Sequence, residues 1–231
     1  MKYKHLFFDL DHTLWDFDAN ARATLQELHD HLKLDERGVH DFDEFHKTYL
    51  AHNEKLWDRY RKGYIKQEEL RLKRMWLTLL DFHIADEDLT REMSERFLDL
   101  LPTRTILFPD TKEVLDYLRE RGYQLHLITN GFEKTQHSKL KHSGLDGYFK
   151  NVVTSEASNS IKPQPEIFIY AMEKAGATVN ESLMIGDTLD VDIAGATSVG
   201  MDQVHVNYNH TPQDIKPTYT IHHLVELKIF L

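Results

Sequence analysis

The sequence contains no cysteine among its 231 residues. Disulfide bonds, cysteine nucleophiles and zinc sites with cysteine ligands are therefore excluded, and the absence fits a reducing compartment. Basic residues are also scarce, with 28 lysines and arginines against 38 aspartates and glutamates and a formal net charge of -10. This balance argues against nucleic acid as a partner, because proteins that bind its backbone concentrate basic residues to displace counterions. An anion bound by this chain needs local positive charge.

A long hydrophobic run is missing as well. The first residues, MKYKHLFFDLDH, contain no continuous apolar segment of the kind found in secretory signals. No run approaches the roughly eighteen apolar residues that span a bilayer. We therefore expect a cytoplasmic protein with no membrane partner. The fifteen histidines lack a zinc-ligand framework such as HExxH, so we expect them at the surface.

What the sequence does contain is a series of short apolar runs that each end in a polar residue. We predict strands at HLFFD, LHLITN, NVVTSE and SLMIGD, a further strand at DQVHVNYN, and a closing helix at HHLVELKIFL. Apolar residues at helical spacing fill 111–122 and 165–176, and Gly122 and Gly176 are expected to end these helices. Strands that alternate with helices predict a parallel sheet, whose ligands bind outside the carboxyl ends of the strands.

The pattern changes between about Asp16 and Phe97. No strand signal occurs there, and apolar residues recur at helical spacing, as at Leu25, Leu28 and Leu32. We therefore predict an α/β protein with a Rossmann-like parallel sheet, helices on both faces, and an inserted all-α domain. The predicted core is 1–15 and 98–231, and the predicted insertion is 16–97.

Polar residues at the predicted strand ends form one candidate site. Clustered carboxylates repel one another unless a divalent cation neutralises them, and oxygen ligands suit Mg²⁺. Such a set is typical of phosphoryl transfer. Its members are Asp9, Asp11, Thr129, Asn130, Lys162, Asp187 and Asp192.

Asp9 and Asp11 lie two residues apart, so an extended strand would turn both carboxylates to one face. This crowding is explained if Asp9 is both a metal ligand and the nucleophile that forms an aspartyl-phosphate. Asp11 would then protonate the leaving oxygen and later deprotonate the hydrolytic water. Lys162 supplies the required local cation, and Pro163 after it favours a loop.

Thr129 and Asn130 are the predicted phosphate-binding groups, through a hydroxyl and a backbone N–H at a strand end. Gly131 is expected to permit a tight turn, with a helix N-terminus adding partial positive charge. For Thr13 we expect a structural role, in which its hydroxyl fixes the loop after the first strand.

These residues resemble the four motifs of the haloacid dehalogenase superfamily of phosphohydrolases, along nearly the whole chain. The motifs are DLDHT, ITNG, IKPQPEIF and GDTLDVDIAGA. The resemblance implies a nucleophile at Asp9, an acid/base at Asp11 whose backbone carbonyl also binds Mg²⁺, and a metal ligand at Asp187. It implies a supporting acid at Asp192, with Asp190 as the alternative. The family commonly has glycine where this chain has Asp110, which leaves the local turn open.

The insertion resembles the helical cap with which this family selects substrates. Two stretches are similar to the YjjG/YfnB-type branch of the family, whose members are pyrimidine 5'-nucleotidases. These stretches are FFDLDHTLWDFDANA and LWDRYRKGYIKQEELR. Trp57 and Tyr60 share one predicted helical face, and Trp15 and Phe17 follow the first motif; aromatic rings there could stack on a nucleobase. Packing inside the protein is the alternative for each of them.

The predicted function is Mg²⁺-dependent hydrolysis of phosphate monoesters, with a nucleoside 5'-monophosphate as substrate. Asp11 favours ester hydrolysis over dehalogenation, because dehalogenating members lack this second aspartate. Sugar phosphates and phosphoglycolate are alternative substrates, and transfer by a mutase stays formally open. A regulatory protein that binds phosphate without turnover is the alternative from another functional class. The sequence does not give the oligomeric state or the preferred base.

Overall fold

The computed structural model describes residues 2–212 and 214–231, and the chain divides into two compact units. The core unit is Met1–Phe17 with Thr105–Leu231, and the helical unit is Asp18–Arg104. The sequence placed the second boundary after residue 97. In the structure the last long helix of the insertion continues to Leu100 and a 3-10 turn follows at Leu101–Thr103, so this boundary lies later in the chain.

The core unit is built on a six-stranded sheet with the order β3-β2-β1-β4-β5-β6, in which all neighbouring strands are parallel. The strands are β1 His5–Phe8, β2 Gln124–Thr129, β3 Asn151–Thr154, β4 Ser182–Gly186, β5 Asp202–Val206 and β6 Tyr219–Ile221. The first five confirm the predicted strands. The sixth was missed, because a three-residue strand at the edge of the sheet leaves little pattern in the sequence.

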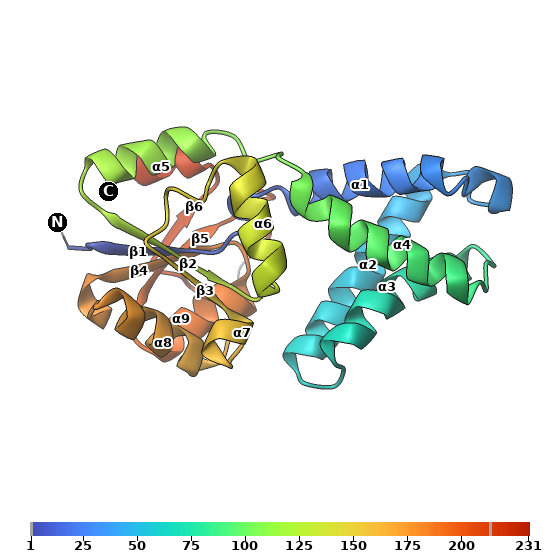
Figure 1. Cartoon of the computed structure of the whole chain (residues 1–231). Coiled ribbons are helices and arrows are strands. Elements are labelled where there is room, and N and C mark those ends of the chain that lie inside the picture. Colours follow the sequence, from blue (N-terminus) through green and yellow to red (C-terminus); the bar gives the residue numbers. More distant parts are fainter. Residues whose placement is uncertain (1, 213) are drawn as a thin grey trace. The chain divides into compact units, whose positions relative to one another are not determined.

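Helices cover both faces of this sheet, as predicted; Figure 1 shows α5 on one side and α8 and α9 on the other. The helices of the core unit are α5 Thr111–Glu120, α6 Glu133–Ser143, α7 Ser155–Ser158, α8 Pro165–Ala175 and α9 Ala194–Ser198. A π-helix at Leu189–Ile193 leads into α9. Gly176 has a φ of 65° and ends α8 in the left-handed conformation, which glycine adopts at little cost.

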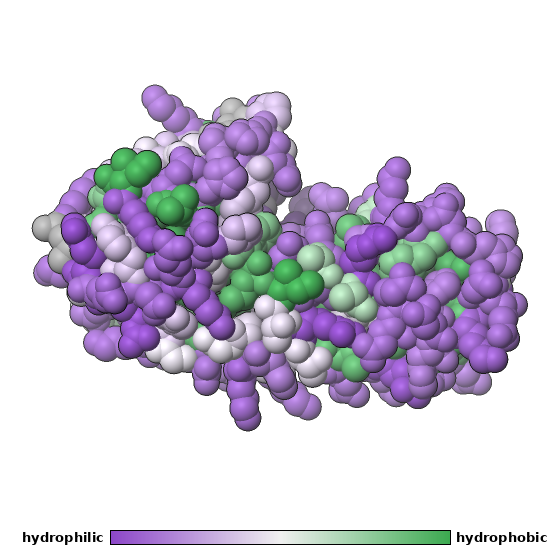
Figure 2. All heavy atoms as spheres, turned by 90° about the horizontal axis from the view of Figure 1, so that it is seen from above, coloured by the Kyte–Doolittle hydropathy of each residue, from purple (hydrophilic) through white to green (hydrophobic). Residues whose placement is uncertain are grey.

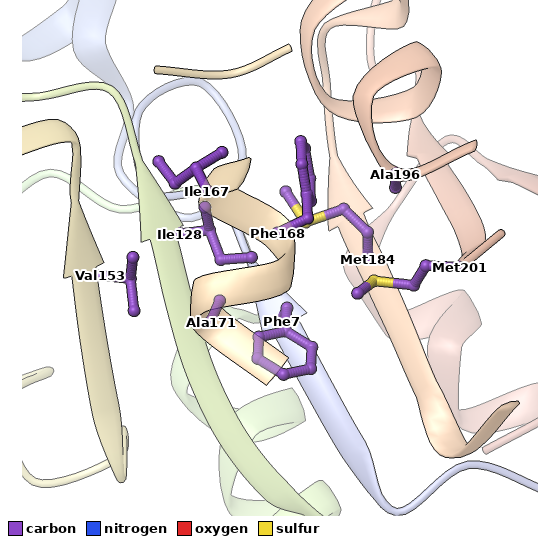
Figure 3. Packing of buried hydrophobic residues seen from close by; sticks show 9 residues of the cluster. All are labelled: Phe7, Ile128, Val153, Ile167, Phe168, Ala171, Met184, Ala196 and Met201. Carbon is purple, nitrogen blue, oxygen red and sulfur yellow. The ribbon is translucent and has the colours of Figure 1, made fainter. Parts of the chain in front are cut away.

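The hydrophobic core lies where α8 packs on the centre of the sheet (Figure 3). Ile167, Phe168 and Ala171 of α8 are fully buried against Phe7 of β1 and Met184 of β4. Burial of a large apolar side chain contributes about 1.5–3 kcal/mol. This packing holds β1 and β4 together, and Asp9 and Asp187 of the candidate site directly follow these two strands.

The helical unit contains four α-helices, which confirms the predicted all-α character of the insertion. They are α1 Phe17–His31, α2 Phe42–Arg61, α3 Gln67–Asp81 and α4 Glu87–Leu100. The predicted stripe of Leu25, Leu28 and Leu32 is buried. The Asp41 and Asp86 side chains accept hydrogen bonds from backbone N–H groups in the first turns of α2 and α4, which caps these helices.

The segments that lead into and out of the insertion are paired with each other inside the core unit. Trp15 and Leu107 form an antiparallel bridge, and the Asp16 backbone N–H donates to the Ile106 carbonyl at 3.1 Å. The entrance and the exit of the insertion are therefore fixed side by side by backbone hydrogen bonds.

Three local features differ from expectation or resolve an open point. The closing segment Leu224–Ile229 is a 3-10 helix rather than an α-helix. Asp110 has a φ of 63°, so it adopts the left-handed conformation for which the family commonly uses glycine. Not all histidines lie at the surface: His126 of β2 and His205 of β5 are buried, because both occupy inward-facing strand positions.

The surface is mainly polar. Most of the face shown in Figure 2 is hydrophilic, with hydrophobic residues in small separate areas. Within the described part of the chain, no helix has both the length and the apolar character needed to cross a membrane.

Candidate active site

The site forms where the parallel strands end. Phe8, the last residue of β1, is aligned with Leu127 of β2 and Ile185 of β4. The Asp9 backbone N–H then donates to the Ile185 carbonyl at 2.9 Å. Asp9 and Asp187 therefore follow neighbouring strands at the same edge of the sheet, as the sequence pattern predicts for ligand-binding residues in a parallel sheet.

Lys162 lies between two of the carboxylates. Its Nζ atom is 2.8 Å from Asp9 Oδ1 and 2.6 Å from Asp192 Oδ1, and it also donates to the Ile128 carbonyl at 2.9 Å. Lys162 and Asp192 are almost completely buried, with 1% and 0% of their surface exposed. A buried ammonium group is costly unless it is paired, and here both carboxylates and a carbonyl oxygen satisfy it.

Asp187 is held by side chains on both of its oxygens. Thr13 donates to Oδ1 and Thr188 donates to Oδ2, each at 3.0 Å. His205 Nε2 lies 2.9 Å from the Asp187 backbone carbonyl. Thr13 thus positions the Asp187 carboxylate, a contact that differs from the role expected for its hydroxyl in fixing the loop after the first strand. His205 was not singled out from the sequence.

The carboxylate oxygens of Asp9, Asp187 and Asp192 lie within 4.8 Å of one another. Among residues 2–212 and 214–231, this is the only group of three or more acidic or histidine side chains arranged to hold a metal ion. With Lys162 the group carries three formal negative charges and one positive charge when all four are ionised. A divalent cation would neutralise the difference, and the all-oxygen donor set fits Mg²⁺.

Burial dominates the electrostatics of this group. It raises the pKa of Asp9 well above its usual range, and the nearby Asp192 and Asp187 carboxylates raise it further, while Lys162 opposes the shift. Burial and the Asp192 charge likewise raise the pKa of Asp187. Burial alone would lower the pKa of Lys162, but the Asp192 and Asp9 carboxylates outweigh burial and raise this pKa. Lys162 therefore stays protonated, and added positive charge would favour ionised Asp9.

Both candidate supporting acids lie on the π-helix, in different surroundings. Asp190 is exposed, whereas Asp192 is buried beside Lys162 and accepts a hydrogen bond from the Thr188 backbone N–H at 3.1 Å. Gly186 makes room for this arrangement, because a Cβ atom there would lie 2.5 Å from the Asp192 carboxylate carbon. The geometry therefore favours Asp192 over Asp190 as the residue that supports the site.

The second motif organises the loop that carries Lys162. The Asn130 amide accepts from the Lys162 backbone N–H at 2.8 Å and donates to the Lys162 carbonyl at 3.0 Å. Thr129 Oγ1 accepts from the Gly131 backbone N–H at 3.0 Å. Gly131 does not have a positive φ; its missing Cβ instead leaves space for Gln136 of α6. The structure thus gives this glycine a packing role beside the turn that was expected of it.

The Asp11 side chain does not join the carboxylate group. It lies beyond the end of β1 and contacts α6, where Gln136 Nε2 donates to Oδ2 at 3.0 Å and Lys139 Nζ lies 2.5 Å from Oδ1. The sequence reading missed both partners, because EKTQHSKLKHS is mostly polar. The sequence does contain one indication of their burial. Gln136 and Lys139 share a helical face with Leu140, an apolar residue expected to be buried.

The four aromatic candidates have different environments. Trp15 is fully buried, with Lys139 Nζ 4.2 Å from its ring centroid, so no face of this ring is open to a substrate. Phe17 is also buried. In the helical unit, Trp57 and Tyr60 form an edge-to-face pair and pack on a small hydrophobic cluster, but both remain partly exposed.

Comparison with known proteins places this site in a family. The model of the haloacid dehalogenase-like hydrolases matches residues 3–200. Pyrimidine 5'-nucleotidase PynA of Streptococcus pneumoniae is 33% identical over 98% of this chain and 94% of its own length. Pyrimidine 5'-nucleotidase YjjG of Escherichia coli is 32% identical over 100% and 99%.

A solved structure extends the comparison to the fold. The HAD-hydrolase YfnB from Bacillus subtilis, bound to magnesium, superposes with a TM-score of 0.88 at 26% identity and covers 99% of this chain and 98% of its own. Sequence and structure therefore agree over both units of the chain. The chain belongs to the haloacid dehalogenase-like hydrolase family.

Proposed function

We propose that this hydrolase cleaves phosphate monoesters through an aspartyl-phosphate on Asp9. The observation that carries the proposal is the group of Asp9, Asp187, Asp192 and Lys162, whose net negative charge would repel a phosphate unless a divalent cation neutralised it. Family membership with two nucleotidases at about a third identity supports a phosphoric monoester hydrolase.

Mg²⁺ fits the oxygen donors of Asp9 and Asp187, with the Asp11 carbonyl as the further ligand implied by the family motif. When bound, the cation would supply positive charge to the phosphate and to ionised Asp9. The solved relative YfnB contains magnesium, which supports the same metal here. Asp192 acts less directly, since it holds Lys162 beside Asp9.

The protein residues then divide the reaction into two displacements. In the first, an Asp9 oxygen bonds to phosphorus while the ester P–O bond breaks, and the Asp11 carboxyl gives its proton to the leaving oxygen. In the second, water attacks the phosphorus of the aspartyl-phosphate and its proton passes to Asp11. Asp9 is released with inorganic phosphate. Lys162 stays protonated beside Asp9, and Thr129 and the Asn130 backbone N–H bind the phosphate oxygens.

The substrate we propose is a pyrimidine nucleoside 5'-monophosphate. The carboxylates and Lys162 would contact only the phosphate group of a substrate. The nucleoside, which is the leaving group, must therefore be recognised by other residues. We place this selection in the helical unit, where Trp57 and Tyr60 keep exposed ring surface. Stacking on a base contributes about 1–3 kcal/mol, which corresponds to a preference of roughly tenfold or more over a sugar phosphate.

The test is phosphate release from a panel of nucleoside monophosphates, hexose phosphates and phosphoglycolate, with Mg²⁺ and with chelator. We expect the highest kcat/KM for a pyrimidine nucleotide and no turnover with chelator. The Tyr60→Ala variant should reduce the preference for nucleotides while its melting temperature shows that the fold is kept. A preference for hexose phosphate or phosphoglycolate would overturn the nucleotidase proposal and leave the phosphatase proposal standing.

A further inference from the structure

Asp11 is held by two side chains of α6 that have no other role in the proposed reaction. Gln136 donates to one carboxylate oxygen at 3.0 Å, and Lys139 contacts the other at 2.5 Å. Because each oxygen has its own donor, the position of the carboxyl group and the orientation of its plane are both fixed. About a quarter of the Asp11 side chain, 24%, stays exposed, so the group remains accessible to a ligand.

Lys139 is placed for this contact at a cost. Only 2% of its surface is exposed, and burial of an ammonium group is unfavourable unless strong partners replace water. Its Nζ atom lies 4.2 Å from the Trp15 ring centroid and 5.6 Å from that of Phe17, which adds cation–π attraction. Trp15 and Phe17, the two rings that were candidates for substrate contact, thus pack against the Lys139 ammonium group.

Gln136 is also buried, with 2% of its surface exposed. Its Nε2 atom occupies the space beside Gly131, since a Cβ atom on that glycine would lie only 1.7 Å away. Its Oε1 atom has no hydrogen-bond partner within the described part of the chain. An unpaired buried carbonyl destabilises a fold, so the packing of α6 alone does not explain this residue, whereas its contact with Asp11 does.

We propose that Gln136 and Lys139 are positioning residues, which hold the Asp11 carboxyl group in the orientation for proton transfer to the leaving oxygen and from the hydrolytic water. The inference rests on the proposed function, and it adds to it the groups that determine how well Asp11 acts. Neither side chain gains or loses a proton in the cycle. The proton that water gives to Asp11 in one turnover is the one that the next leaving oxygen receives.

The test compares two leaving groups in the Lys139→Met variant. A nucleoside alkoxide needs a proton to depart, whereas p-nitrophenolate leaves without one. Because kcat/KM covers the steps up to the first irreversible one, it reports the displacement in which the ester bond breaks. We expect kcat/KM for the nucleotide to fall by roughly 10²-fold, the lower end of general acid catalysis, mainly through kcat. The value for p-nitrophenyl phosphate should change far less.

Three further variants separate positioning from damage to the fold. Lys139→Arg keeps the charge and should retain most of the activity. Asp11→Asn should show the same selective loss, and its combination with Lys139→Met should add little to it. Lys141→Met removes an exposed lysine from the same helix and should change neither substrate. If Lys139→Met does not fold, Gln136→Leu provides the same comparison.

Equal losses with both substrates, no loss, or additive losses with Asp11→Asn would overturn the inference. If the wild-type protein hydrolyses neither ester, the proposed function fails instead. A crystal structure of Lys139→Met then decides the inference separately. The carboxyl group of Asp11 should have moved, and an unchanged position would refute the positioning role.

Discussion

At the scale of single residues, Asp9 is the proposed nucleophile, and the burial of its charge beside other carboxylates is unfavourable for folding. Its carboxylate is buried beside Asp187 and Asp192, and these surroundings raise its pKa. We expect Asp9→Asn to abolish phosphate release, because an amide does not attack phosphorus. In metal-free buffer the free energy of unfolding should stay equal or rise, because one buried negative charge is removed while Lys162 keeps an acceptor.

Phosphate release and urea unfolding measure the two parts of this prediction. Asp190→Asn is the matched control, since it makes the same change at an exposed acid on the neighbouring π-helix. Turnover by Asp9→Asn near the wild-type rate would show that another group is the nucleophile.

Gly186 offers a second test at the residue scale. A Cβ atom at this position would meet the Asp192 carboxylate at 2.5 Å. Gly186→Ala should therefore push Asp192 away from Lys162 and destabilise the protein by about 1–3 kcal/mol, the usual range for overpacking. Chemical denaturation measures this effect. Gly147→Ala is the control, because nothing lies within 4 Å of a Cβ there, and equal stability losses in the two variants would contradict the explanation.

At the scale of the elements, β2 contains a buried titratable group outside the catalytic residues. Burial, with smaller contributions from His5 and Lys150, lowers the pKa of His126 from 6.5 to about 4. The ring stacks on Phe7, its Nε2 atom lies 3.1 Å from His5 Nδ1, and the Asn151 amide donates to its Nδ1 atom at 3.0 Å. The imidazole is therefore held neutral in the folded protein.

Because the unfolded chain binds this proton at higher pH, the contribution of His126 to stability is complete above pH 6.5 and declines as the pH falls towards 4. The expected loss between pH 7 and pH 5 is about 2 kcal/mol. His126→Gln should remove this part of the pH dependence, whereas His137→Gln, at an exposed site on α6, should not. Urea unfolding at pH 7 and pH 5 measures the free energy of unfolding at each pH. If the difference between the two values were the same in His126→Gln as in the wild type, the assignment would be contradicted.

The elements also show which features a sequence can predict. Asp9 and Asp187 could be singled out because they directly follow apolar runs that the sequence pattern predicts as strands of a parallel sheet. Gln136 and Lys139 were missed because polar residues in a polar helix normally face solvent. Their burial depends on a contact with Asp11, which lies far away in the sequence. The sequence left Trp15 open between stacking on a substrate and packing inside the protein, because its pairing with Leu107 is a tertiary contact that no local pattern reveals.

At the scale of the whole molecule, any salt can stabilise an acidic chain by screening its charge. A magnesium site should stabilise the folded protein beyond this general effect. A ligand that binds only the folded state at a concentration of one hundred times its Kd stabilises the protein by about 2.7 kcal/mol. We expect Mg²⁺ to raise the melting temperature by several degrees, and Asp187→Asn to abolish most of this increase. A sodium salt of equal ionic strength is the control, and an equal increase with sodium would show general screening instead of a site.

The insertion starts and ends at two backbone segments that pair with each other, at Trp15–Leu107 and Asp16–Ile106. The core unit is therefore continuous in space across the point where the insertion leaves it. Removal of Asp18–Arg104, with a short glycine linker from Phe17 to Thr105, would leave every strand of the sheet and every residue of the carboxylate group in place. We expect this shortened chain to fold, as circular dichroism would show, and to hydrolyse p-nitrophenyl phosphate without a preference among nucleotides. A shortened chain that still preferred pyrimidine nucleotides would place selection in the core unit. The ability to cleave and the ability to choose would thus be separable, and the same core could serve a different substrate by receiving a different loop.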